Sequence, residues 1–505
     1  MRGLLQSDCW GLLHPASVVT AAVLIAGCTV GPDFHRPGAP RITGYTPEPM
    51  VSQTSSANAQ GGEAQRFIQG MDIPGQWWIL FHSEPLNSLI DRALKANPNL
   101  QAAHAALRQA MENVYAQGGF YFPAVQTNYS PSRQRNAVGT IAPTLTTGDT
   151  FFNLHTAQLT VGYTLDAFGA NRRQVESLQA QAEFQRFQLE ATYLTLTSNL
   201  VVAAVQEASF RAQITATEKV VSLETDQLEI FRRQYALGAI AMGEVVAQEV
   251  TLAQTLATLP NLKKQLAQQH NLLAALSGRF PSEESTETFD LSALTLPQEL
   301  PLTVPSKLVE QRPDVRSAEE QLHSASAQIG VATANMLPQI TLSAAYGGTA
   351  TQIAELLATN NVFWSVAGSV SQTVFAGGTL LHRKRAAVAA FDQAAAQYRS
   401  TVITAFQNVA DSLRALQYDA EALNAQVAAE RAAVENLEIA RRALQLGSIS
   451  YLALLNAEQA YQQTVVNLVQ AKTNRFVDTA ALFQALGGGW WNRADLTRHI
   501  SPAPQ

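Results

Sequence analysis

The chain has 505 residues, of which 47% are hydrophobic and 15% are charged, and its net charge is -6. This mildly acidic balance argues against nucleic acid as a partner. Beyond residue 30, no stretch approaches the roughly 20 continuous apolar residues of a membrane-spanning helix, which argues against a helical membrane protein.

Residues 1–27 are predicted to be a signal peptide and are set aside from the fold. The apolar stretch runs into Leu24-Ile25-Ala26-Gly27-Cys28, which resembles a bacterial lipobox, where the signal is cut before a cysteine that receives lipid. Cleavage would remove Cys9, so Cys28 would be the only cysteine of the mature chain and could form no disulfide within it. We expect a covalent lipid on Cys28, such as palmitate, and no other cofactor. The alternative is a plain secretory signal with an incidental cysteine.

Residues 28–76 are rich in Pro, Gly, Ser and Gln and are predicted to be a lipidated, extended tether. A first repeat, 77–305, follows and begins with short helices on either side of Pro98. A β-hairpin is then predicted at about 123–166, because apolar residues such as Val125 and Val161 alternate with polar ones. Such strands would have one apolar and one polar face.

The first repeat continues with a long helix at 171–237, because this stretch contains neither Gly nor Pro and is bracketed by Gly169 and Gly238. At 1.5 Å per residue it would be roughly 100 Å long. A return helix is predicted at 244–277, where Pro260 is expected to kink or break it. An irregular connector completes the repeat.

The same order of elements recurs in a second repeat, 306–489. The predicted elements are a short helix at 313–336, a β-hairpin at about 338–375, a long helix at 379–446 and a return helix at 450–486, followed by a C-terminal tail at 490–505. From Val402 to Leu444 the apolar residues follow an alternating three-four spacing, which is typical of helices packed as in a coiled coil. An ordinary soluble coiled coil or helical bundle would show this pattern as well.

The four predicted strands raise the question of their open edges. They are long enough to cross a bilayer when tilted, but four strands cannot close a barrel, and an open edge in lipid leaves backbone groups without hydrogen bonds. Either the strands form a small β-domain covered by helices, or several chains share one barrel. Two chains would supply eight strands and three would supply twelve, and the polar alternate positions suit a water-filled lumen.

Short sequence runs add information along the whole mature chain. They are Cys28 with Gly31-Pro32-Asp33-Phe34 and Pro37; Trp77-Trp78 with Phe81 and Pro85-Leu86; Leu89-Ile90, Ala93-Leu94 and Asn97-Pro98; Arg312-Pro313-Asp314-Val315-Arg316 with Ala318-Glu319; and Ala485-Leu486-Gly487-Gly488-Gly489-Trp490. Each run alone is weakly specific. In this order, with the duplicated elements, the chain resembles the TolC-like outer-membrane efflux proteins, and most closely the lipoprotein subfamily associated with resistance-nodulation-division (RND) multidrug efflux systems.

The resemblance implies an α+β membrane protein built as a homotrimer. Its trimeric, twelve-stranded β-barrel would take four strands per chain and continue into a long periplasmic α-helical barrel. It implies a lipid-anchored protein of the Gram-negative outer membrane, which Thr29 after Cys28 also favours by resemblance to lipoprotein sorting signals. The expected partners are outer-membrane lipid, a periplasmic membrane-fusion adaptor and an inner-membrane RND-type pump.

The function implied is that of a passive exit duct for drugs or other small molecules. One alternative is the exit channel of a type I secretion system, and another is a lipid-tethered periplasmic coiled-coil scaffold. No catalytic or metal-binding residue is predicted, because the sequence has no phosphate-binding loop and no H-E-x-x-H helix. The nine His are scattered, and His104 and His323 are interpreted as helix-surface or packing residues.

The resemblance also points to two functional places. The turns that end the long helices would dock the adaptor, although the glycines at their centres cap helices in any protein. A constriction of the tunnel would involve Leu452, and Asn456 takes the place where related channels carry an acid. The docking turns comprise Leu237, Gly238, Ala239, Leu446, Gly447 and Ser448. The cationic runs Asn171-Arg172-Arg173 and His382-Arg383-Lys384-Arg385 are interpreted as solvated helix starts, or as groups near the membrane surface or tunnel mouth.

Overall fold

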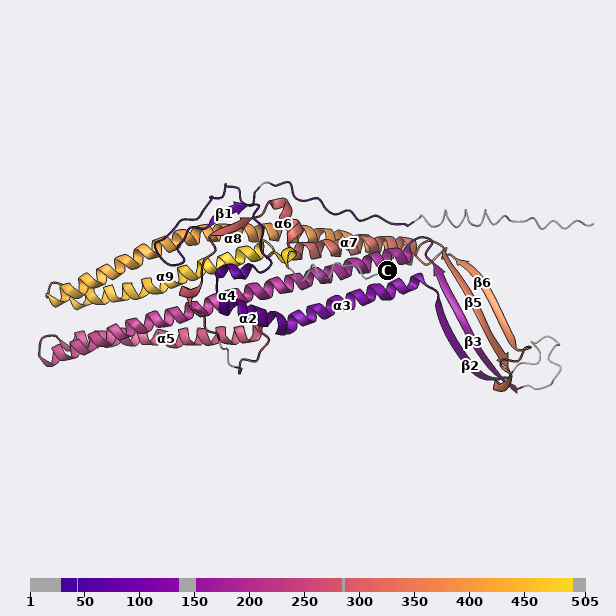
Figure 1. The fold of residues 1–505 in the computed structure, drawn as a ribbon, viewed down its shortest axis with the longest axis horizontal. Coiled ribbons are helices and arrows are strands. Elements are labelled where there is room, and N and C mark those ends of the chain that lie inside the picture. Colours follow the sequence, from indigo (N-terminus) through magenta and orange to yellow (C-terminus); the bar gives the residue numbers. More distant parts are fainter. Residues whose placement is uncertain (1–28, 43, 136–150, 284–286, 494–505) are drawn as a thin grey trace, which may run out of the picture. The chain divides into compact units, whose positions relative to one another are not determined.

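The computed structural model describes residues 29–42, 44–135, 151–283 and 287–493, which fall into two compact units. We call them the strand unit and the helical unit. The strand unit contains residues up to Arg36, Arg108–Phe184 and Glu319–Gln397, and the helical unit contains Pro37–Leu107, Gln185–Ala318 and the residues from Tyr398 onward. Figure 1 shows the elements of both units along the chain.

The strand unit contains one four-stranded antiparallel sheet in the order β2-β3-β5-β6 (Figure 1). Its strands are β2 (Ala124–Arg135), β3 (Phe151–Leu165), β5 (Gln339–Ala350) and β6 (Val362–Ser371). The β3–β5 pairing joins the hairpins of the two repeats. Within the described residues, the outer edges of β2 and β6 have no strand beside them. Strand β6 ends at Ser371, so residues 372–375, which the sequence assigned to the hairpin, lie outside the sheet.

The register places the apolar positions predicted in the four strands, such as Val125, Val161, Leu342 and Val370, on one face of the sheet. Thr127, Leu159, Tyr346 and Trp364 lie directly across from one another in successive strands. The adjoining row is Gln126, Thr160, Ala345 and Ser365, which belongs to the opposite face. Because a slip of one residue would exchange the faces, this register preserves the alternation predicted strand by strand.

The two long helices are α4 (Ala170–Ala236) and α8 (Thr379–Gln445), with 67 residues each. Both bounds lie within one residue of the predicted ones. Helix α4 begins where the side chain of Asp166 accepts hydrogen bonds from the backbone N–H groups of Asn171 and Arg172, at 2.9 and 2.8 Å. A carboxylate at this position satisfies free donors and complements the helix dipole.

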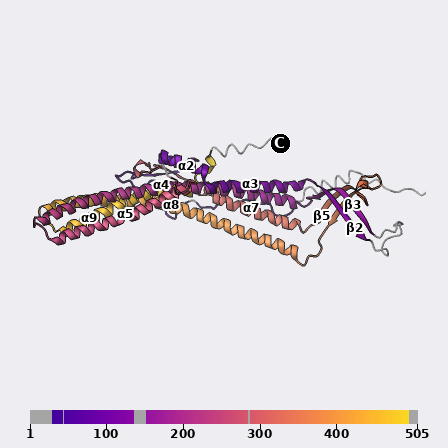
Figure 2. The same ribbon diagram turned by 90° about the horizontal axis from the view of Figure 1, so that it is seen from below.

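Each long helix is followed by a return helix, α5 (Met242–Leu276) and α9 (Tyr451–Ala485), with 35 residues each. Helix α5 continues through Pro260, so the expected break does not occur. The shorter helices are α2 (Glu84–Ala96), α3 (Pro98–Gly118), α6 (Pro305–Gln311) and α7 (Pro313–Ala334). No helix among the described residues contains a stretch apolar and long enough to cross a bilayer. Figure 2 shows the elements from a second direction.

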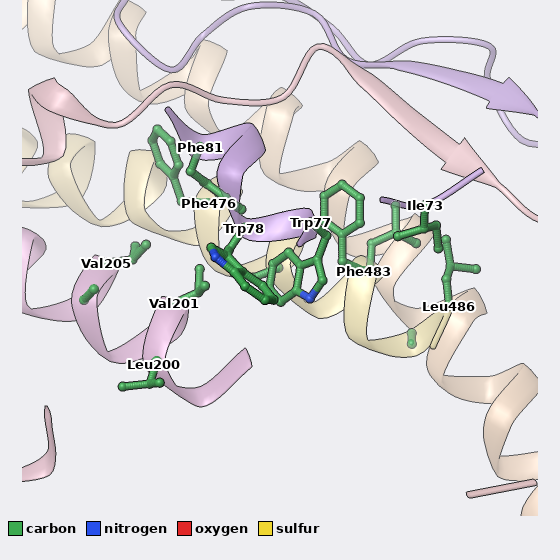
Figure 3. Close-up of a cluster of buried hydrophobic side chains, with 14 of the residues drawn as sticks. Ile73, Trp77, Trp78, Phe81, Leu200, Val201, Val205, Phe476, Phe483 and Leu486 are labelled. Carbon is green, nitrogen blue, oxygen red and sulfur yellow. The ribbon is translucent and has the colours of Figure 1, made fainter. Parts of the chain in front are cut away.

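The core of the helical unit is built around the 3-10 helix η1 (Trp77–Phe81). Both indoles are only 1% exposed, and the ring of Trp77 stacks on Phe483 of α9 with 5.3 Å between centroids. Figure 3 shows these rings gathered with Val201 of α4 and with Phe483. The aromatic residues that open the first repeat therefore hold α4 and α9 together.

The segment before Trp77 is not a free tether. Strand β1 (Arg66–Gln69) pairs in parallel with β4 (Glu299–Leu302), a strand inside the stretch expected to be irregular. The fully buried guanidinium of Arg475 donates hydrogen bonds to the carbonyl oxygens of Gly61 and Glu63, at 2.8 and 3.0 Å, and to the side chain of Gln65 at 2.9 Å. Composition alone missed this packing, because backbone carbonyls bound by a distant side chain leave no local pattern.

Candidate functional site

The turns that end the two long helices have the same geometry. Gly238 and Gly447 adopt φ values of +72° and +71°, which an L side chain rarely tolerates. The N–H of Ala239 donates to the carbonyl of Gln234 and that of Ser448 donates to Ala443, both at 2.9 Å. These bonds form Schellman motifs, which satisfy the last carbonyls of each helix.

The residues beside these glycines are strongly exposed. Leu237 and Leu446 are each 84% exposed, and Ala239 and Ser448 are exposed as well. An isolated exposed leucine is ordinary, but the same residue at the same place in both turns forms a matched pair of apolar protrusions. The six residues predicted for docking are therefore accessible in the chain.

A small apolar cluster, which we call the tip cluster, lies just behind the turns and joins the two helical hairpins. Phe231 of α4 and Tyr451 of α9 meet edge to face with 4.6 Å between ring centroids. Its buried members are Leu228, Phe231, Val245, Leu437, Ala440, Tyr451, Leu454 and Ala457. These residues come from α4, α5, α8 and α9, so the cluster packs the α4–α5 hairpin against the α8–α9 hairpin.

Two buried carboxyl groups lie next to the tip cluster. Glu224 of α4 is 2% exposed and Glu458 of α9 is 3% exposed. Thr255 of α5 donates to one oxygen of Glu224 at 3.0 Å, and the other oxygen accepts no hydrogen bond from the described residues. Both oxygens of Glu458 lack such a bond, and its nearest cation is Arg441 of α8, with 3.6 Å between Nη2 and Oε1.

Burial raises the pKa of both groups. The pKa of Glu224 rises to about 7, mainly through loss of hydration and partly through repulsion from Glu458, although the bond from Thr255 opposes the shift. Burial likewise raises the pKa of Glu458, against the attraction of Arg441. A cavity of about 570 Å³, lined in part by Thr255 and Gln462, lies beside this pair.

A polar bridge connects the hairpins at the same level. The Gln248 side chain of α5 donates to the backbone carbonyl of Glu224 at 3.2 Å and accepts a hydrogen bond from the Tyr451 hydroxyl. Burial and the nearby carboxyl groups raise the pKa of Tyr451, so its hydroxyl keeps the proton that it donates. The contact between hairpins is therefore a mixture of apolar packing and buried polar groups.

The predicted constriction residues lie on the other side of α9. Leu452 is 63% exposed and Asn456, one turn later, is also exposed. Glu458 points inward instead, toward Arg441. The acidic side chain nearest to the predicted constriction is therefore enclosed within the chain.

The sequence analysis did not predict that Glu224 is buried, although the sequence contains a signal for it. Val220, Glu224, Leu228 and Phe231 follow the three-four spacing of a buried helix face, and all four are buried. A carboxylate at an apolar position of such a face indicates a buried acid. Among the described residues, no cluster of three or more His, Cys, Asp or Glu side chains is arranged to hold a metal ion.

In the strand unit, the start of α4 binds the N-terminal segment. The Arg172 guanidinium donates to the Thr29 hydroxyl at 2.8 Å, and Arg173 forms ion pairs with Asp33 and Glu176, at 2.6 and 2.7 Å. Cys28, the predicted lipid-attachment residue, lies outside the described residues, but its neighbour Thr29 is held at this helix start.

His323 is a packing residue in the same unit. Its ring stacks on Phe34 with 4.3 Å between centroids, and its nitrogens lie 3.4 Å from Glu320 and 3.1 Å from Glu176. The hydrogen bond with Glu320 and the contact with Glu176 raise its pKa despite burial. These contacts fit the interpretation of His323 as a packing residue.

Comparison with known proteins gives consistent matches over nearly the whole chain. The family model described as outer membrane efflux protein matches residues 89–279 and 304–488. The toluene efflux pump outer membrane protein TtgC of Pseudomonas putida is 27% identical over 478 residues, which cover 94% of this chain and 96% of TtgC. The cation efflux system protein CusC of Escherichia coli is 25% identical over 479 residues, which cover 93% of this chain and 97% of CusC.

Solved structures agree with these matches. The outer-membrane channel OprN is 27% identical, with a TM-score of 0.81 over 92% of this chain and 100% of the OprN chain. The Campylobacter jejuni CmeC outer membrane channel, at 22% identity, has a TM-score of 0.81 over 94% of this chain and 98% of its own, a likeness that concerns the fold.

Proposed function

The chain belongs to the outer membrane efflux protein family, and on that premise we propose that it is the outer-membrane exit duct of a tripartite efflux pump. Members of the family are channel proteins rather than enzymes. In the proposed role, drugs or other small molecules pass through passively. A periplasmic adaptor and an inner-membrane RND-type pump supply the substrate and the energy.

The observation that carries the proposal is the four-stranded sheet. Its register gathers apolar side chains on one face and polar side chains on the other, and both outer edges are open within the described residues. A sheet with these faces suits lipid on one side and water on the other, but its edges cannot remain unpaired in lipid. Three chains, with β6 of each pairing with β2 of the next, would close a twelve-stranded barrel.

The helical tips support the proposed docking to an adaptor. Leu237 and Leu446 protrude from two turns of the same geometry and pack against no core among the described residues of their own chain. We assign the adaptor contact to these leucines with Gly238, Ala239, Gly447 and Ser448. Replacing Leu237 and Leu446 together by Ser should leave folding unchanged and weaken adaptor binding at least about tenfold. Binding to the purified adaptor measures this directly, and undiminished binding would remove the tips from the docking surface.

The lumen and the lipid anchor complete the proposal. Leu452 and Asn456 are exposed on a face of α9 that the described residues leave uncovered, which suits a constriction inside a helical barrel. The position of Thr29 at the start of α4 suits a lipid on Cys28, because it brings the anchor to the end of the sheet. Mass spectrometry of the mature N-terminus tests the lipid directly.

The decisive measurement is the mass of the detergent-extracted protein from separated outer membranes, by native mass spectrometry or light scattering. A trimer that conducts ions in a planar bilayer is expected. A monomer would leave the sheet edges open and favour a tethered scaffold. If deletion of the gene abolishes export of a protein and leaves drug resistance intact, the duct serves a secretion system instead.

A pair of charge substitutions tests the faces of the sheet. Val161 and Leu342 belong to the apolar face, so Val161→Asp or Leu342→Asp should prevent assembly in the outer membrane. Thr160→Asp, on the opposite face, serves as the control because that face would border water. Equal assembly of all three variants would contradict the barrel.

A further inference from the structure

In both repeats the chain leaves the sheet at the same end of the strands. Leu165, the last residue of β3, lies opposite Ile340, and Ile340 lies opposite Val370 near the end of β6. Strands β3 and β6 therefore run in the same direction and end at the same level of the sheet. Helices α4 and α8 begin a few residues later, so their first turns lie at one level of the strand unit.

The first turn of α4 is occupied by its own chain. Arg172 and Arg173 bind Thr29 and Asp33, and a side chain at Gly169 would meet Thr29 at 2.7 Å. Thr29 directly follows the predicted lipid-attachment residue. The proposed lipid anchor would therefore enter the bilayer near the start of α4.

The first two turns of α8 carry more positive charge and have no such occupant among the described residues. His382, Arg383 and Arg385 are exposed, and Lys384 is half-buried. None of these side chains forms an ion pair or hydrogen bond with another described residue. Arg385 stands where the first repeat has Glu176, which pairs with Arg173, and no acidic residue occurs from Leu356 to Phe391.

Exposed apolar side chains precede these cations in the chain, between β6 and α8. Val374 and Phe375, which connect β6 to α8, are 92% and 88% exposed. They follow Val370, which is 70% exposed on the apolar face of β6. The apolar face of the sheet thus continues into a segment with an exposed aromatic ring and ends at a group of cations.

We propose that this surface, Val374 and Phe375 with residues 382–385, docks anionic phospholipid headgroups at the membrane boundary. The proposal rests on the proposed function, because it requires the sheet to lie in the bilayer. Aromatic rings prefer the boundary between headgroups and acyl chains, and clustered cations attract anionic headgroups beyond it. The order along the surface, apolar face, ring and then cations, matches the order of layers in a lipid leaflet.

A second copy of the chain is a less suitable occupant. Carboxylates of the strand unit such as Asp33, Glu176 and Glu319 already form ion pairs within the chain. In a neighbouring copy these three carboxylates would already be neutralised, whereas a leaflet containing phosphatidylglycerol supplies many negative charges.

The test uses the full-length protein extracted in mild detergent and mixed with equal amounts of phosphatidylglycerol and phosphatidylethanolamine of the same acyl chains. Native mass spectrometry counts the molecules of each lipid that stay bound. Wild type should retain phosphatidylglycerol preferentially, and the triple variant R383Q/K384Q/R385Q should lose that preference by about fivefold or more. The variant R383K/R385K keeps the charges and should retain it.

A matched control removes three exposed cations elsewhere, in the variant K264Q/R431Q/R442Q, and should bind lipid as wild type does. Equal preference in the triple variant and wild type would overturn the proposal. So would an equal loss in the control, because bulk charge would then explain the effect. If the triple variant dissociates into single chains with its lipid preference intact, the surface is a contact between copies. The oligomeric mass in the same spectra and the bilayer conductance of wild type report separately on the proposed function.

Discussion

The aromatic core around Trp77 and the tip cluster around Tyr451 hold the same helices together in different ways. The core is large and apolar, with both indoles of η1 almost fully buried. The tip cluster is much smaller and adjoins two buried carboxyl groups, of which three oxygens accept no hydrogen bond from the described residues. The hairpins are therefore joined by extensive apolar packing at one end, and at the other by few apolar contacts next to buried acids, where local opening should cost less free energy.

Removing an indole from the core should have the largest effect on stability. Trp77→Ala deletes a ring that stacks on Phe483, and large-to-small changes of this kind cost about 3–5 kcal/mol. We expect little folded protein in outer membranes and a strongly lowered melting temperature in detergent. Ile79→Ala in the same short helix is the control, because Ile79 is 43% exposed and its loss should cost less than about 1 kcal/mol. Equal stability of the two variants would contradict the core assignment.

The attachment of the N-terminal segment should be the next most sensitive feature. Arg475→Met leaves the carbonyl oxygens of Gly61 and Glu63 without their donor, at a cost of about 2–3 kcal/mol. Limited proteolysis should then cut between residues 54 and 65, where wild type is protected. Lys472→Met, a half-buried cation one turn earlier on α9, should leave protection unchanged. A variant at Arg475 that resists protease as wild type does would show that other contacts hold the segment.

The tip cluster should respond to pH. Glu224 has a folded pKa of about 7, above the value of 4.5 expected in an unfolded chain, so the folded protein binds this proton more tightly. The contribution of Glu224 to the free energy of unfolding is therefore fully present below about pH 4.5. It is lost as the pH rises through about 7. Glu224→Gln should stabilise the tips by about 3 kcal/mol at pH 8 and by almost nothing near pH 4.5.

Hydrogen exchange in the last turns of α4 and the first turns of α9 measures this effect locally. The comparison of variant with wild type separates the effect of Glu224 from that of other titrating groups. One such group is Asp419, because burial and the neighbouring Asp478 raise its pKa to about 7. Glu229→Gln, at an exposed position of the same helix, is the matched control for the loss of one carboxyl group. A benefit of Glu224→Gln that is the same at both pH values would contradict ionisation as its cause.

The smallest effect on stability should come from the exposed face of α9. Asn456→Asp changes a side chain that is exposed among the described residues, so the melting temperature should stay within the change expected for about 0.5 kcal/mol. If Asn456 lines a constriction, the added ring of carboxylates should increase the preference for cations over anions in bilayer conductance. Gln459→Glu, also exposed on α9, is the matched control. Unchanged selectivity would place Asn456 away from the conducting path.

The sequence predicted the long elements well because their signals extend over many residues. The absence of Gly and Pro located α4 and α8 to within one residue, and period-two alternation located the four strands. Strands β1 and β4 were missed because four residues carry too little periodicity, and of the two outcomes expected at Pro260, a kink or a break, the break does not occur. The facing of Glu458 depends on how two hairpins pack, and no local pattern encodes that.

The pairing of β3 with β5 has a consequence for how such a protein assembles. Two separate hairpins would expose four sheet edges, and this pairing leaves only two among the described strands. In a barrel closed by several chains, half of the pairings between neighbouring hairpins are therefore made within one polypeptide. These pairings form at a rate that does not depend on protein concentration. Only the remaining pairings depend on encounters between chains. This shortens the time during which unpaired strand edges are available for aggregation.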